Sequence, residues 1–206
     1  MTGQHRVHPI EARSYEIMES EVDFSRWPGD SGALVKRMVH ATADESFEST
    51  ALIGERAAHA LIGALRAGAS ILCDANMVVA GVPSVASSRT VRCYLGDSRV
   101  PDRESEGMTR SAMAIDVAAA EHPTGAIWVF GNAPTALVRL LHLHGSGAVE
   151  PAAVIGLPVG YVGAAEAKRD LWASDLRPVS VTNSGRRGGS AAACAVLNAA
   201  WRLLGC

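Results

Sequence analysis

His40 is the histidine whose neighbours in the sequence are the most chemically informative. It closes the segment Lys36-Arg37-Met38-Val39-His40, in which two basic residues precede it by four and three positions. On a helix this spacing brings Lys36, Arg37 and His40 to one side. A cationic neighbour lowers the pKa of an imidazole, whereas a helix C-terminus or a bound carboxylate raises it. The spacing alone leaves two interpretations open, a catalytic acid or base and a structural histidine.

The spacing of the other metal-ligating residue types does not predict a metal site. His142 and His144 are two residues apart, which points them in different directions on a helix, and no His-x-x-x-His pair accompanies them. The four cysteines lack a C-x-x-C pair and metal-ligand spacing. We therefore expect no bound metal.

The glycine-rich segment Gly156–Gly163 does not match a nucleotide fingerprint. Its glycines are spaced G-x-x-x-G-x-x-G rather than G-x-G-x-x-G, and the chain has no G-x-x-x-x-G-K-[ST] motif. The segment either cradles a ligand with backbone amides or makes a tight turn between a strand and a helix. The sequence predicts no cofactor.

Arginine supplies nearly all of the positive charge, because Lys36 and Lys168 are the only lysines among 19 basic residues. A GC-rich genome explains such a bias, but so does an acidic ligand, since a guanidinium offers paired donors to carboxylates or phosphates. Arg110 falls in the first turn of an expected helix, where the helix dipole disfavours a cation and a nearby anion would compensate. Arg186 and Arg187, before two glycines, form a second candidate anion site, with solvated surface arginines as the alternative.

Length and composition predict one globular domain over residues 1–206. Hydrophobic residues make up 48% of the chain, charged residues 19%, and the net charge is −2, which excludes a disordered tail protein and a polycationic nucleic-acid coat. Apolar stretches are interrupted before about 18 residues, and the chain opens with polar residues. We expect a cytoplasmic protein with neither nucleic acid nor membrane as a partner.

The apolar pattern predicts a three-layer α/β/α fold with a mainly parallel five-stranded sheet. Two helices are expected before residue 45, the first from Pro9 and the second capped by Asp30 or Ser31. Five short apolar runs then alternate with helix-length segments, as in parallel strands joined by crossovers. These strands are expected at residues 70–73, 91–95, 126–130, 152–155 and 178–182.

In such sheets ligands bind beyond the carboxyl ends of the strands. The loops there begin near Asp74, Gly96, Gly131, Gly156 and Asn183. Polar residues in these loops either contact a ligand or cap helices, and capping is the expected role of Asp74, Thr109 and Asn132.

Seven segments, in order from about residue 9 to residue 200, carry a resemblance to a known family. They are residues 10–17 (IEARSYEI), 37–40 (RMVH), 69–78 (ASILCDANMV), 109–112 (TRSA), 131–136 (GNAPTA), 156–166 (GLPVGYVGAAE) and 188–190 (GGS). Together they resemble precorrin-8X methylmutase, an isomerase family of corrin biosynthesis on the cobalamin pathway. The resemblance implies a flavodoxin-like fold, a homodimer with the site near the subunit interface, and a reaction without a cofactor.

The resemblance also implies a reaction and roles for residues. The family moves a methyl group from C-11 to C-12 of precorrin-8X to give hydrogenobyrinic acid, or converts the cobalt-containing equivalent to cobyrinic acid. By its place in the motif, His40 would donate and take back the proton that assists a [1,5] sigmatropic shift. Ser14, Arg37 and Arg110 match positions expected to contact the tetrapyrrole, with its ionised acetate and propionate arms.

Thr109, Asn132, Gly160 and Arg186 are further expected substrate contacts. A non-catalytic tetrapyrrole-binding protein that uses the same arginines remains the alternative function, and a nucleotide-binding flavodoxin-like protein is a weaker one. The N-terminal eight residues and Cys206 receive no role, and the sequence does not distinguish a metal-free from a cobalt-containing substrate.

Overall fold

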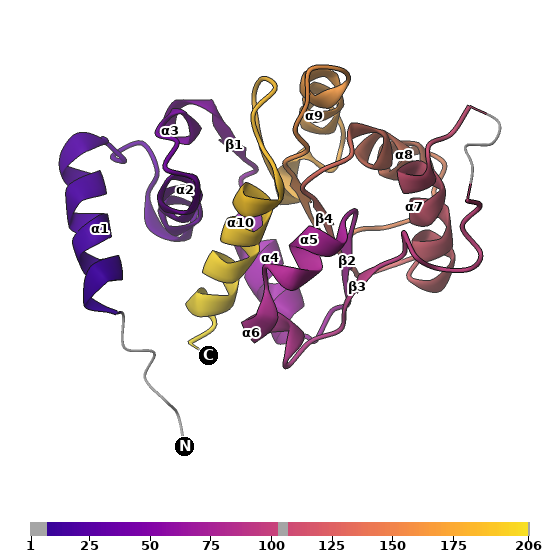
Figure 1. Ribbon diagram of the computed structural model, residues 1–206, viewed down its shortest axis with the longest axis horizontal. Coiled ribbons are helices and arrows are strands. Elements are labelled where there is room, and N and C mark those ends of the chain that lie inside the picture. Colours follow the sequence, from indigo (N-terminus) through magenta and orange to yellow (C-terminus); the bar gives the residue numbers. More distant parts are fainter. Residues whose placement is uncertain (1–7, 103–106, 206) are drawn as a thin grey trace.

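A six-stranded sheet lies between two layers of helices in the computed structural model, which describes residues 8–102 and 107–205 (Figure 1). Cys206 and the segment before His8 lie outside the described residues. The strands are β1 (Ala51–Ile53), β2 (Ile71–Cys73), β3 (Val91–Cys93), β4 (Ile127–Phe130), β5 (Ala153–Gly156) and β6 (Ser180–Asn183). The helices are α1 (Pro9–Glu21), α2 (Gly29–Thr42), α3 (Ser46–Thr50), α4 (Ala57–Arg66), α5 (Asn76–Ala80), α6 (Pro83–Ala86), α7 (Arg110–Glu121), α8 (Pro134–Gly145), α9 (Ala164–Ala173), the 3₁₀ helix η1 (Arg177–Val179) and α10 (Ser190–Leu203).

The strand order confirms the predicted fold class. The order across the sheet is β1-β6-β5-β4-β2-β3, and every neighbouring pair except β1 with β6 is parallel. Renumbered along the chain, the five parallel strands lie in the order 2-1-3-4-5, which is the flavodoxin-like order. The order reverses between β2 and β4, so the carboxyl ends of these two strands flank the crevice where such sheets bind ligands.

The prediction of five strands was wrong by one, because β1 forms a sixth strand at the edge. Ala51 pairs with Asn183 and Ile53 with Val181, in antiparallel register. Three residues that follow α3 directly have no alternation long enough to mark a strand, so only pairing with β6 reveals it. The antiparallel direction brings the start of β1, and α3 before it, to the carboxyl end of β6.

Alternate residues of the central strands face two separate cores. In β4, Ile127 and Val129 pack into the core under α2, α4, α5 and α10, whereas Trp128 and Phe130 pack into the core under α7, α8 and α9. This alternation is what a strand buried on both faces requires. Helix α1 lies outside these layers, next to α2 at one end of the molecule (Figure 1), and Met18 is its one buried residue among those described.

Of the predicted helix caps, only Thr109 is confirmed, and the predictions at the start of α2, at Asp74 and at Asn132 were wrong. Helix α2 begins at Gly29, earlier than Asp30 or Ser31 would have allowed as caps, and it has no side-chain cap. Pro28 is the N-cap residue and is extended. A proline is tolerated at a helix start because its missing backbone N–H would have no partner within the helix there. Thr109 is the N-cap of α7, and its Oγ1 accepts from the backbone N–H of Ala112 at 3.3 Å. Asn132 is exposed and caps nothing, because Ala133 occupies the N-cap position of α8.

Asp74 is a buried carboxylate that holds two strand ends together rather than capping its own helix. Its oxygens accept from the backbone N–H groups of Gly131, Asn132 and Ala133 at 2.9, 2.8 and 2.6 Å. Burial raises the pKa of the Asp74 carboxyl, against the effect of these three donors. One side chain after β2 thus shapes the loop after β4, at the point where the strand order reverses.

We expect Asp74→Ala to lower the free energy of unfolding by about 3 kcal/mol, because it leaves buried backbone donors without an acceptor. Asp97→Ala is the matched control after β3, where the carboxylate binds the exposed Arg99, and it should cost much less than Asp74→Ala because surface ion pairs contribute little. Urea unfolding at equal protein concentration measures both. Equal losses in the two variants would show that Asp74 does not hold the strand ends.

Candidate active site

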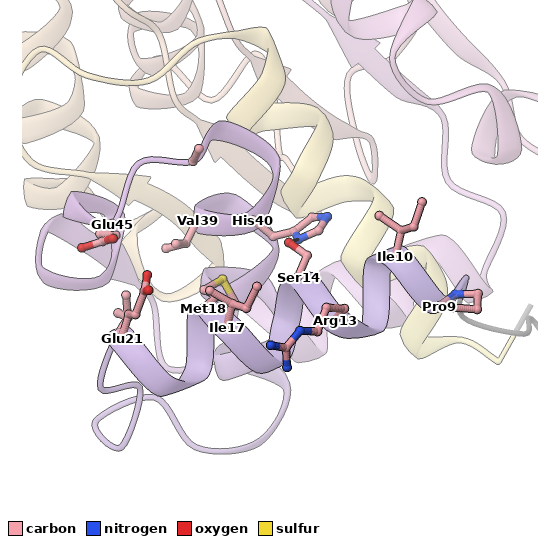
Figure 2. Close-up of a pocket in the computed structure, with 12 residues that line it drawn as sticks. Pro9, Ile10, Arg13, Ser14, Ile17, Met18, Glu21, Val39, His40 and Glu45 are labelled. Atoms are coloured by element: carbon pink, nitrogen blue, oxygen red, sulfur yellow. Dashed lines mark hydrogen bonds between the residues drawn. The ribbon is translucent and has the colours of Figure 1, made fainter.

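Helices α1 and α2 enclose a hollow of about 600 Å³ with His40 in its wall. Apolar side chains dominate the lining, and Ser14, Arg13, Glu21 and Glu45 add polar groups at its margins (Figure 2). Hollows of this size with few polar groups are typical of binding sites for organic ligands. His40 is therefore placed at a binding surface rather than in the core.

Two residues of α1 fix the orientation of the His40 ring. The Oγ of Ser14 lies 3.1 Å from Nδ1 of His40, and its side chain points at the ring (Figure 2). The ring of Tyr15 stacks on the imidazole with centroids 4.7 Å apart and planes inclined by 3°. Within the part of the chain that the structure describes, Nε2 of His40 makes no hydrogen bond. The ring is held at Nδ1 and across its face, which leaves Nε2 for a ligand.

Glu11 joins the two active-site helices to the last helix. Its Oε1 accepts from Arg37 of α2 and from Arg202 of α10, both at 2.6 Å. These bonds to Arg202 and then Arg37 lower the pKa of the Glu11 carboxyl, although burial opposes them. Two guanidiniums share one carboxylate, so the cluster keeps a net positive charge close to His40.

The pKa of His40 is lowered from its ordinary value of 6.5. Burial is the largest cause, and the positive charge of Arg37 adds to it, while Glu11 opposes the shift. Lys36 does not take part as the spacing suggested, because its Nζ bonds Glu19 at 2.6 Å. In the free protein at neutral pH, the imidazole is therefore mainly neutral.

The structure brings Ser14, Arg37 and His40 together as the sequence predicted, but Arg37 has a partner that was not foreseen. We expected its guanidinium to face substrate, and instead one nitrogen binds Glu11. Its Nε is buried and finds no acceptor among the described residues. Arg37 is not among the residues that line the hollow with His40; it lines a separate hollow between α2, α5 and α10.

Thr109 and Arg110 lie at the start of α7 and Asn132 on the loop after β4, and within the described chain no hydrogen bond or ion pair joins them to His40. Thr109 forms a hydroxyl hydrogen bond with Thr135 at 2.7 Å, which ties the starts of α7 and α8. Arg110 is exposed and donates to the carbonyl of Leu95 at 2.8 Å. Its position at a helix start is thus explained in part by a backbone acceptor.

Gly160 and Arg186 lie together on two neighbouring loops. The N–H of Gly160 donates to the carbonyl of Arg186 at 3.2 Å, and the guanidinium of Arg186 lies 5.4 Å from the centre of the exposed Tyr161 ring. The next residue, Arg187, binds Asp44 just past the end of α2. The two loops therefore continue the carboxyl edge of the sheet toward the end of α2 that carries His40.

Sequence reasoning missed Glu11, Tyr15 and Arg202. A signal existed for two of them, because Glu11, Ser14, Tyr15 and Met18 have the spacing of one helix face. No signal existed for Arg202, since its contact with Glu11 spans nearly the whole chain.

In the described residues, no group of three or more His, Cys, Asp or Glu side chains is arranged to hold a metal. None of the described helices combines the length and apolarity needed to cross a membrane.

Comparison with known proteins decides the family. The family pattern for precorrin-8X methylmutase matches residues 9–203. The chain belongs to this family. A precorrin-8X methylmutase of Pseudomonas aeruginosa is 41% identical over 194 residues, covering 92% of each chain. A cobalt-precorrin-8 methylmutase of Salmonella typhimurium is 37% identical over 199 residues, again covering 92% of each chain.

A solved structure supports the same assignment for this member of the precorrin-8X methylmutase family. The crystal structure of a precorrin-8X methylmutase from Thermus thermophilus superposes with a TM-score of 0.84 at 35% identity, covering 96% of this chain and 98% of that chain. The family and the isomerase activity expected from the sequence are confirmed, so this protein is an isomerase of cobalamin biosynthesis.

Opposite charges flank His40, so two substitutions should shift its pKa in opposite directions. Arg37→Met should raise the pKa, because it removes a cation that disfavours the imidazolium. Glu11→Gln should lower it further, because it removes the anion that favours the charged ring. NMR titration of the ring signal that disappears in His40→Gln measures both shifts.

Arg13→Met is the control for this titration, since Arg13 lines the same hollow but pairs with Glu16 and should leave the pKa unchanged. If α1 merely detached in both variants, solvation of the ring would raise the pKa in each. A rise in Glu11→Gln would therefore contradict the electrostatic explanation.

Proposed function

We propose that this protein moves a methyl group from C-11 to C-12 of precorrin-8X, or of its cobalt-containing equivalent, with His40 as the proton donor and acceptor. The observation that carries the proposal is the setting of His40. It is oriented by Ser14 and Tyr15, forms part of the wall of an apolar hollow, and lies beside a cluster with net positive charge. The substrate class named by the relatives, a flat ring with carboxylate arms, fits such a surface.

The proton required by the reaction would come from the imidazolium form of His40. Transfer to a nitrogen of the macrocycle makes the conjugated system electron-poor, which lowers the barrier to the [1,5] shift; the proton then returns to His40. No atom is gained or lost in this sequence. With Nδ1 engaged by Ser14, Nε2 is the nitrogen that would carry the proton to and from the ring.

Binding of the substrate would itself change the protonation of His40. In the free protein burial and Arg37 keep the pKa low, so an imidazolium formed there is a stronger acid than usual. Several substrate carboxylates close to the ring would offset Arg37 and raise the pKa. The acid would thus be charged when the substrate is present.

The substrate arms need cationic partners, and the chain offers them in two regions. Near His40, the side chains of Arg37 and Arg202 are both partly exposed. Along the carboxyl edge of the sheet, Arg110 and Arg186 are exposed. We assign the arms to these groups, and the ring to the apolar wall of the hollow.

Thr109, Asn132 and Gly160 complete the proposed substrate contacts. They lie at the same carboxyl edge of the sheet as Arg110 and Arg186, with small or polar groups that suit a close approach of the ring's periphery.

The hollow is open on the side of α1, which suggests that a second copy completes it. Ile10 and Ile17 line the hollow yet are 74% and 44% exposed. Apolar side chains at the rim of a binding site are typical of surfaces that a partner covers. We therefore propose the homodimer with the site near its interface that the resemblance implies. A cytoplasmic location stays a prediction from the sequence.

His40→Ala should reduce conversion of precorrin-8X at least 1,000-fold while hydrogenobyrinic acid still binds with micromolar or tighter affinity, because acid–base groups contribute rate and the carboxylate contacts remain. Absorption spectra follow conversion and titration together. His59→Ala, on the exposed face of α4, is the control and should behave as the native protein. Undiminished turnover in His40→Ala would contradict the proposed role of His40. Tight binding without turnover in the native protein would favour a non-catalytic tetrapyrrole-binding protein.

The rate should fall as the pH rises, because His40 loses the proton that the reaction needs. Because the acid form is required, log(kcat/KM) should fall by one unit per pH unit above the low pKa of the free protein. The fall in kcat should come at higher pH, since bound carboxylates raise the pKa in the complex. Steady-state rates between pH 5 and 9 test this, and a kcat/KM that increases with pH through this range would contradict it.

A further inference from the structure

Lys168 is a fully buried cation beneath the loops at the carboxyl edge of the sheet. It lies on α9, is 1% exposed, and is flanked by the buried Ala164, Ala167 and Leu171. Its Nζ donates to Oδ1 of Asn183 at 2.9 Å and to the backbone carbonyl of Arg187. Burial of an ammonium group is costly, so its position here points to a role for its charge.

No carboxylate in the described residues forms an ion pair with this ammonium group. The charged groups on the neighbouring elements are engaged elsewhere: Arg139 of α8 binds Asp116, and Arg177 of η1 lies over Trp172. On its own helix, Glu166, Arg169 and Asp170 are exposed. The acceptors of Lys168 are therefore neutral, and its charge is not compensated by the protein.

The segment that Lys168 holds is the loop Asn183–Gly189, which packs tightly on the loop after β5. The N–H of Gly189 donates to the carbonyl of Leu157 at 2.8 Å. Gly188 has φ +156°, and a Cβ there would lie 2.5 Å from the carbonyl oxygen of Leu157. Only glycine permits this approach, so the loop has one close-packed path with Lys168 beneath it.

This loop also carries more positive charge than the protein neutralises. Arg187 binds Asp44, but Arg186 has no ion pair among the described residues and lies over Tyr161. Lys168, on α9, places a second uncompensated charge against the same loop through its contact with the carbonyl of Arg187. Like charges near one another repel, and an anion bound at this edge would relieve the repulsion.

We propose that Lys168 is a positioning residue for the isomerase. Its ammonium group holds the Asn183–Gly189 loop in the path that presents Arg186 to a carboxylate arm of the substrate, and its uncompensated charge adds to the attraction for that arm. The proposal rests on the proposed function, because it takes the ligand to be the ring with carboxylate arms. Lys168 does not touch the reacting atoms, so its effect falls on binding rather than on the chemical step.

The buried position makes this role sensitive to pH. Burial lowers the pKa of Lys168 to about 8, so the ammonium form dominates at neutral pH and is lost in mildly alkaline solution. Loss of the charge weakens both hydrogen bonds and removes the attraction for the carboxylate. Ligand affinity therefore falls as the pH rises through about 8.

Lys168→Met tests the role, because methionine has a similar length but neither charge nor donors. We expect KM for precorrin-8X to rise at least tenfold, with kcat changed less than threefold. Binding of hydrogenobyrinic acid should weaken above about pH 8 in the native protein and show no such dependence in Lys168→Met. Arg169→Met, which removes an exposed charge from the same helix, should match the native protein.

A second measurement does not depend on the variant folding. Trypsin cleaves after arginine, and Arg186 and Arg187 lie in the loop that Lys168 holds. In the native protein, cleavage there should be several-fold faster at pH 9 than at pH 7, after correction for trypsin activity on a small amide substrate. Lys168→Met should be cleaved rapidly at both values, and mass spectrometry identifies the cut.

The possible failures are distinguishable. An unchanged KM and an unchanged pH dependence in Lys168→Met would overturn the role of Lys168 and leave the proposed function intact. A loss confined to kcat, or equal cleavage of the native loop at pH 7 and pH 9, would also overturn it. If the native protein did not convert precorrin-8X, the proposed function itself would fail.

Discussion

The sharing of one carboxylate between two arginines is the interaction on which the active site depends. Helix α1 has one buried residue in the described chain, so apolar packing alone holds it weakly. Glu11 binds it to α2 through Arg37 and to α10 through Arg202. With α1 held there, Ser14 and Tyr15 reach His40, and the hollow between the two helices acquires its second wall.

The same cluster sets the electrostatics of the histidine. A single ion pair would be neutral, whereas two cations on one anion leave a positive charge that disfavours the imidazolium until anions arrive. Positioning and charge are thus supplied by the same side chains. Helix α2 lies between the apolar hollow near α1, which His40 lines, and the hollow between α5 and α10, which Arg37 lines.

Two buried charged residues, Asp74 and Lys168, organise the loops at the other end of the site. Asp74 and Lys168 have opposite signs, yet each is bound by neutral partners: backbone N–H groups for Asp74, and a side-chain amide and a backbone carbonyl for Lys168. Both lie at the carboxyl edge of the sheet and fix the path of a loop after a neighbouring strand. Loops that would otherwise be mobile are therefore set by buried charges.

The amino-acid sequence was enough to predict the fold class, the five parallel strands and His40 as the candidate catalytic residue. Hydrophobic periodicity and short apolar runs predict local structure and burial, and the order of the motifs indicates the family. All of these features depend on local sequence patterns. The start of α7 at its Thr109 cap was readable for the same reason. The short edge strand β1 was not, because three residues carry no alternation and only β6 makes them a strand.

The ion pairs between elements could not be predicted, because they depend on how the elements pack. The contact of Glu11 with Arg202 joins the first helix to the last, and that of Lys168 with Arg187 joins a helix to a loop 19 residues away. Arg37 was correctly placed near His40, but its carboxylate partner lies on another helix. Sequence spacing reports neighbours within an element, whereas ion pairs between elements depend on how those elements pack.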